Sequence, residues 1–92
     1  MIVSFADQDT ADFFEGTRVR RFANIAMVAE RKLQQLDSAA SLQALQSPPG
    51  NRLEALLGKR KGQHSIRIND QFRLCFVWAP DGVQKVTIVD YH

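Results

Sequence analysis

The apolar residues of this 92-residue chain change their spacing near its middle, and this change limits the possible folds most. Before residues 47–50 they recur every three or four positions, which is the period of an amphipathic helix. After that point they alternate with polar residues, as in a strand with one buried face. The break itself reads Ser-Pro-Pro-Gly, which cannot continue a helix. The sequence therefore predicts an α+β fold, with a helical half followed by a sheet half.

The helical half begins with a short segment. Residues 2–5 form an apolar run suited to a buried strand. Asp9 or Thr10 can cap a short helix that runs to Glu15, and Gly16 is placed to end it.

A longer helix is expected next. Its apolar stripe consists of Phe22, Ile25, Ala26, Ala29, Leu33, Leu36 and Ala40. Residues 17–21 precede the stripe and either begin this helix or form a loop.

The second half predicts an antiparallel meander over residues 64–69, 72–78 and 85–91, joined by two tight turns. The side chains expected beneath the helices are Ile66, Ile68, Phe72, Leu74, Phe76, Trp78, Val86 and Ile88. Alternation sends Ser65, Arg67, Arg73, Cys75, Thr87 and Tyr91 to the opposite face. We therefore expect one dry face and one uncovered face that is basic and aromatic.

Charge is unevenly distributed along the chain. The formal net charge is +2, but residues 7–15 contain four acids and no base. The bases between residues 52 and 73 are Arg52, Lys59, Arg60, Lys61, Arg67 and Arg73, against two acids. This block has the electrostatic character that a polyanion requires, and it is equally consistent with ordinary solvated surface.

Several classes of protein are disfavoured by composition. The single cysteine, Cys75, cannot form an internal disulfide. His64 and His92 do not have the spacing of metal ligands, so we expect neither a metal nor a cofactor. The start does not resemble a secretory signal, and no apolar run approaches the ~20 residues of a membrane helix. We expect one cytoplasmic domain over residues 1–92, without membrane attachment.

The last three residues carry the chemistry of interest. Asp90, Tyr91 and His92 lie at the end of a predicted strand beside Arg73. Together they supply a base, an acid and a positive charge. These groups suffice for metal-free RNA cleavage, in which the ribose 2′-hydroxyl attacks the adjacent phosphorus.

Three segments of the chain resemble HigB-type toxins of the RelE-like superfamily, and especially the branch that includes GraT. These segments read PPGNRLEAL, QHSIRINDQFRLCF and VDYH. The resemblance implies two N-terminal helices packed on one face of a mostly antiparallel four-stranded sheet. It implies an endoribonuclease that cuts messenger RNA in the ribosomal A site. It also implies a helix-turn-helix antitoxin as partner, and contact with operator DNA only through the complex of the two proteins.

The resemblance assigns roles to individual residues. Arg73 would stabilise phosphoryl charge, Tyr91 would stack on or activate the nucleotide, and Asp90 and His92 would take part in proton transfer. The residues expected to hold RNA are Arg52, Lys59, Arg60, Lys61 and Arg67.

Two positions depart from the family pattern. Well-studied members carry His at the position of Glu54 and Lys at that of Leu57. Glu54 is therefore either a general base or an ordinary surface residue. The departures predict weaker activity than in members with the fuller set.

Two other functions remain open at this stage. The same superfamily contains toxins that inhibit DNA gyrase without a nuclease site, although the ending Asp90-Tyr91-His92 argues against this alternative. The basic block alone would also suit a noncatalytic nucleic-acid-binding protein, whose affinity would fall steeply with salt.

Overall fold

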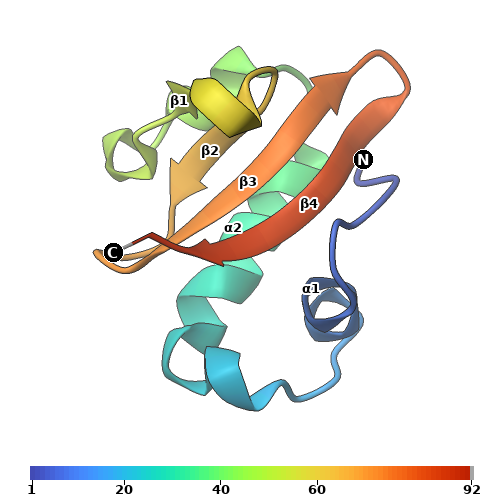
Figure 1. The fold of residues 1–92 in the computed structure, drawn as a ribbon, viewed down its shortest axis with the longest axis vertical. Helices are drawn as coiled ribbons and strands as arrows, with labels where there is room; N and C mark the ends of the chain where they lie inside the picture. The colour runs from blue at the N-terminus through green and yellow to red at the C-terminus, as the bar shows by residue number, and fades with distance from the viewer. Residues whose placement is uncertain (92) are drawn as a thin grey trace.

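A four-stranded sheet with helices at one face and one edge forms the structure, a computed structural model that describes residues 1–91 (Figure 1). Two α-helices come first, α1 (Gln8–Phe14) and α2 (Ala26–Ser38). The strands are β1 (Glu54–Ala55), β2 (His64–Arg67), β3 (Phe72–Ala79) and β4 (Gly82–Asp90). Short 3-10 turns connect them: η1 (Arg20–Ile25), η2 (Gln43–Gln46), η3 (Pro49–Asn51) and η4 (Gly58–Arg60).

The sheet has the order β1-β2-β3-β4, and every neighbouring pair is antiparallel. This confirms the predicted meander. The fourth strand is β1, from the PPGNRLEAL segment. The N-terminal run makes only two parallel bridges to β4, Ile2 to Val83 and Phe5 to Val86.

Helix α2 crosses one face of the sheet, behind the strands in Figure 1. The buried apolar side chains are Phe13, Phe22, Ile25, Ala29, Leu33, Leu36, Leu45, Ile66, Ile68, Leu74, Phe76, Val83, Val86 and Ile88. Phe72 and Trp78 are partly buried against this core. The face predicted to lie beneath the helices is therefore confirmed.

The long helix is shorter than its apolar stripe. Residues 20–25 form the 3-10 turn η1, and α2 begins only at Ala26. Phe22 and Ile25 still reach the core from the turn, because a 3-10 turn also places residues three apart on one side. Ala40 lies beyond the end of α2 and is exposed.

Helix α1 lies at the outer edge of β4, so the expectation of two helices on one face is met only in part. Asp7 caps this helix, in place of the predicted Asp9 or Thr10. The buried Thr10 hydroxyl accepts a hydrogen bond from the Ile88 N–H (3.1 Å), and the Thr87 hydroxyl donates to Asp7 (2.7 Å). Helix α1 therefore satisfies groups that an edge strand would leave unpaired.

The opposite face is less open than predicted. Ser65 and Cys75 are both 0% exposed. The segment after β1 folds back, with the Leu56 N–H bonded to the Gln63 carbonyl (2.9 Å), and η4 lies in front of the sheet in Figure 1. The end of this face near Tyr91 remains accessible, since Tyr91 is 43% exposed. In the described part of the chain, no helix is long and apolar enough to span a membrane.

Candidate active site

Arg73 lies at the centre of the candidate site. It is the second residue of β3, and its side chain is only 11% exposed. Its Nε donates to Ser65 Oγ (2.8 Å), and its Nη2 donates to the carbonyls of Arg52 (2.7 Å) and Ser65 (3.4 Å). No hydrogen bond within residues 1–91 involves its Nη1. The guanidinium is thus fixed on two sides and keeps donors for a further group.

Strand register explains why these groups meet. Ser65 pairs with Cys75, one alternation step from Arg73, so Ser65 and Arg73 share a face. Glu54 pairs with Ser65 across the next ladder and reaches the same place. Its Oε1 is 4.0 Å from Arg73 Nη2, and its side chain is 56% exposed. The carboxylate is therefore accessible to a ligand. An exposed ion pair of this length contributes little to stability.

Tyr91 covers the other side of Arg73. Its ring centroid is 6.0 Å from Arg73 Cζ, which is within cation–π range. Its backbone N–H donates to the Gln71 carbonyl (2.6 Å), which extends the β3–β4 pairing by one residue. The structure therefore brings Arg73, Tyr91 and Glu54 together.

The remaining predicted proton-transfer groups are placed differently. Asp90 pairs with Phe72, whose ring packs edge-on against Phe22 in the core. Alternation therefore directs Asp90 away from the face of Arg73, and its carboxylate accepts a hydrogen bond from Gln71 Nε2 (3.0 Å). His92 lies outside the described residues.

The predicted RNA-binding residues fall into two groups. Arg52, Lys59 and Lys61 are exposed around η3 and η4. Arg60 is half-buried and donates to Gln63 Oε1 (3.3 Å). Arg67 is half-buried and paired with Asp70, which is itself fully exposed.

The pKa values of Cys75 and Lys32 are shifted by burial and by nearby positive charges. Burial raises the pKa of the Cys75 thiol, although Arg60 and Arg73 oppose the change. Arg60 and Arg73 therefore both lie close enough to Cys75 for their charges to act on it. Burial lowers the pKa of Lys32, and the nearby charges of Arg31 and Arg67 lower it further.

A metal-dependent site is not apparent in the described residues. Residues 1–91 contain no group of three His, Cys, Asp or Glu side chains that could hold an ion. His64 stacks on Phe76, with ring centroids 6.3 Å apart, and so has a packing role.

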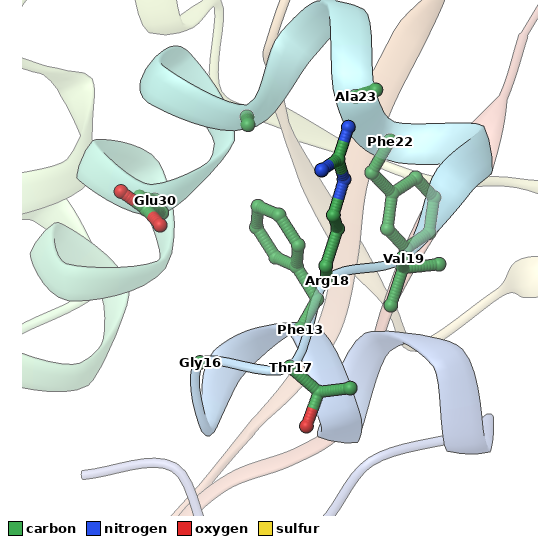
Figure 2. Close-up of a pocket in the computed structure, with 9 residues that line it drawn as sticks. Phe13, Gly16, Thr17, Arg18, Val19, Phe22, Ala23 and Glu30 are labelled. Carbon is green, nitrogen blue, oxygen red and sulfur yellow. The ribbon is translucent and has the colours of Figure 1, made fainter.

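A separate pocket of 280 Å³ lies between α1 and the η1–α2 segment (Figure 2). Phe13 and Phe22 form part of its wall, and Arg18 and Glu30 also line it. None of the predicted site residues lines this pocket, so it is separate from the candidate site around Arg73.

Sequence reasoning missed part of the site around Arg73. The Arg52 carbonyl is a backbone group, so no side-chain pattern indicates it. Asn51, which precedes it, is 0% exposed and is the last residue of η3, shortly before a strand of only two residues. Ser65 was placed on the correct face, but its bond to Arg73 required the strand register.

Comparison with known proteins identifies the family. The sequence model of HigB-like toxins, described as the RelE-like toxin HigB of type II toxin-antitoxin systems, matches residues 3–92. The chain belongs to the HigB-like toxins. This toxin is 42% identical to Toxin HigB-1 of Vibrio cholerae serotype O1 over 94 residues, which cover 100% of this chain and 98% of that protein.

Two further matches are more distant. The toxin is 34% identical over 64 residues to an uncharacterized protein of Haemophilus influenzae, covering 70% of this chain and 63% of that one. A solved YoeB–YefM complex from Staphylococcus aureus contains a chain that superimposes with a TM-score of 0.63 at 19% identity. This match covers 100% of the toxin and 95% of that chain, and it shows that the two share a fold.

Proposed function

We propose that this HigB-like toxin is an endoribonuclease that cuts messenger RNA in the ribosomal A site and so stops translation. The observation that carries the proposal is the anchoring of Arg73 beside Tyr91 and Glu54, with donors left for a ligand. A guanidinium held in this way is suited to the charge that develops on a phosphoryl group.

The proposed reaction needs no metal. A base removes the proton of the 2′-hydroxyl, the 2′-oxygen bonds to phosphorus, and the bond from phosphorus to the 5′-oxygen breaks. An acid protonates the departing oxygen, which leaves a 2′,3′-cyclic phosphate and a 5′-hydroxyl. Arg73 stabilises the extra negative charge on the phosphoryl oxygens, and Tyr91 stacks on a base of the RNA.

Proton transfer is assigned to the acidic and imidazole groups. We propose Glu54 as the general base, because its exposed carboxylate lies 4.0 Å from Arg73 Nη2. His92 is proposed as the general acid, and Asp90 as a residue that assists it. Arg52, Lys59, Arg60, Lys61 and Arg67 are proposed to hold the RNA backbone.

The proposed partner is an antitoxin with a helix-turn-helix fold. Membership in a type II toxin-antitoxin family supports this proposal, and the structural neighbour was solved as a YoeB–YefM complex. Operator DNA would be contacted only through the complex. The motifs around residues 48–56 and 63–76 support placement in the GraT branch, and a cytoplasmic location is proposed with it.

The decisive experiment is cleavage of a defined message in a reconstituted translation system, with and without ribosomes. We expect site-specific breaks within codons only when ribosomes are present, and none with Arg73→Ala. Cleavage of naked RNA would overturn the dependence on ribosomes. Intact message in both reactions, together with DNA cleavage complexes when gyrase is added, would favour the noncatalytic inhibitor.

A further inference from the structure

Asn51 is a buried polar residue with an unusually complete set of partners. Its side chain is 0% exposed. Lys32 Nζ, from α2, donates to its Oδ1. Its Nδ2 donates to Gln35 Oε1 (3.1 Å), also on α2, and to the carbonyls of Leu45 (3.1 Å) and Ser47 (3.3 Å). Asn51 therefore ties the turn before β1 to α2.

The next residue of the chain carries one of the groups that hold Arg73. Arg52 has φ 47°, in the left-handed region that residues other than glycine rarely adopt. Its N–H bonds to the Pro49 carbonyl (3.2 Å), while its own carbonyl accepts from Arg73 Nη2 (2.7 Å). The direction of this carbonyl depends on the left-handed turn.

Such a turn requires support from its surroundings. A single left-handed residue is unfavourable on its own and persists where neighbouring contacts determine it. The hydrogen bonds from Lys32 and to Gln35 tie Asn51 directly to α2, and Gln35 Nε2 also donates to the Ser47 carbonyl before the turn (2.6 Å). Without them, the Arg52 backbone is free to adopt the commoner negative φ, which would turn its carbonyl away from Arg73.

We propose that Asn51 is a positioning residue for Arg73, because it holds the turn that directs the Arg52 carbonyl at the guanidinium. The inference rests on the proposed nuclease function for its catalytic consequence. Its structural part, that Asn51 controls the environment of Arg73 Nη2, is testable independently of cleavage.

The first test compares Asn51→Ala with Val83→Ala. Val83 is buried at the start of β4, at the far end of the strand from Val89, which pairs with Arg73. Val83→Ala therefore destabilises the core through a cavity without touching the site. Single-turnover cleavage is measured against toxin concentration on ribosomes that carry a defined message, at a temperature where both variants are folded.

We expect Asn51→Ala to lower the saturating rate about 10- to 100-fold, since small misplacement of a catalytic group has effects of this size. The half-saturating concentration should change by less than about threefold, because the interaction that is removed acts on the transition state. Val83→Ala should retain the wild-type rate. Equal reductions in both variants would make Asn51 a merely stabilising residue and overturn the proposal.

The second test follows Arg73 directly by ¹⁵N NMR of its side chain. In the wild type, the bond to Arg52 should slow rotation of the guanidinium and keep the Nη2 signal distinct. Asn51→Ala should average this signal and leave the Nε–H bond to Ser65 intact. An unchanged Nη2 signal would overturn the proposal even if the toxin cleaves RNA. An averaged signal in a protein that cleaves nothing would refute only the proposed function.

Two substitutions of Arg52 separate the effect of its backbone conformation from the effect of its charge. Arg52→Gly and Arg52→Val remove the same charge, but glycine accepts a positive φ and valine strongly disfavours it. We expect the Gly variant to keep the Nη2 signal and a saturating rate at least about tenfold above that of the Val variant, consistent with the sensitivity of catalysis to position. Equal rates and equal spectra in the pair would show that the turn does not position Arg73.

Discussion

At the scale of single residues, the geometry of Arg73 yields a sharp prediction. Its planar, forked guanidinium donates hydrogen bonds to Ser65 Oγ and to the Arg52 carbonyl at the same time. Its Nη1 is still available as a donor to a ligand. Lysine keeps the charge but lacks the fork, so Arg73→Lys should lower single-turnover cleavage by about 100-fold or more, as removal of a transition-state donor does.

The control for this substitution is Arg20→Lys, an exposed position outside the candidate site. We expect that variant to cleave at the wild-type rate. Full activity in Arg73→Lys would mean that only a positive charge is needed at this position, and that the fork geometry has no catalytic role.

For single residues, the alternation of apolar and polar positions predicts which face of the sheet a side chain lies on, but not all of its contacts. It predicts that Arg73 and Tyr91 share a face, and the two side chains do meet. It also placed Ser65 and Cys75 on that face, but it did not predict that both are buried. The bond from Arg73 to the Arg52 carbonyl joins residues 21 positions apart, and it depends on one left-handed turn that hydrophobic periodicity does not encode.

At the scale of elements, the cap of α1 couples stability to pH. Partial burial disfavours the charged form of Asp7, but bonds from Thr87 and Thr10 and the charge of Arg21 prevail and lower its pKa. A lowered pKa in the folded state stabilises the fold above the pKa of the unfolded chain, and this stabilisation is lost as the pH falls through the folded value.

Asp7→Ala should therefore lower the free energy of unfolding by about 0.5–2 kcal/mol at pH 7. The difference from wild type should begin to shrink as the pH falls below the ordinary aspartate pKa of about 4, and it should vanish as the pH falls through the lower pKa of folded Asp7. Urea denaturation at several pH values measures both effects. Asp9→Ala removes an exposed ion pair with Arg21 and an acidic group from the first turn of α1, but no cap. It should cost less, and a larger effect at Asp9 would contradict the assignment of the cap.

The η4 segment offers a second prediction at this scale. Cys75 is 0% exposed and burial raises its thiol pKa, so alkylation requires a local opening of the structure. The charge of Arg60, the last residue of η4, acts on this thiol, so we expect that opening to involve the η4 region. Gly62, two residues after η4, has φ 95°. Gly62→Ala strains that position and should speed native-state labelling of Cys75, as followed by mass spectrometry. Gly16→Ala introduces comparable strain at φ 100° in the helical half, and equal acceleration there would indicate general destabilisation.

Prediction of the elements succeeded where periodicity is long and failed where it is interrupted. Strands β2 and β3 follow the alternation, and β4 follows it from Val86 onward. Before Val86, a shift in the β3–β4 register and the positive φ of Lys85 interrupt it. The stripe from Phe22 to Ala40 predicted one helix, but the structure starts it at Ala26. A 3-10 turn buries the same apolar residues, so the pattern alone cannot distinguish the two.

At the scale of the whole molecule, contacts between the chain ends limited what the sequence could predict. The Thr87 hydroxyl reaches Asp7, and the Ile88 N–H reaches Thr10, across about 80 residues. These bonds place α1 at the edge of β4 rather than beside α2 on the sheet face. Hydrophobic periodicity predicts which side of an element is buried, whereas such polar contacts decide which neighbour it has.

Charge distribution is also a property of the whole molecule, and it gives the last prediction. Lys59 and Lys61 are exposed around η4, on the side of the sheet opposite α2. If they bind RNA phosphates, Lys59→Gln/Lys61→Gln should reduce the slope of log affinity against log salt by about 0.7 for each phosphate that is no longer neutralised. The probe is a short RNA with a 2′-deoxy group at the scissile position, and binding is followed by fluorescence anisotropy.

The matched control is Arg18→Gln/Arg20→Gln, two exposed positions in and just before η1. Either pair lowers the formal net charge of +2 by the same amount, so a long-range effect of net charge would weaken binding equally in both. Local binding of the phosphate backbone would lower the salt slope only in the η4 pair. Equal slopes in the two double variants would place the RNA elsewhere on the toxin, and the basic block would then be ordinary solvated surface.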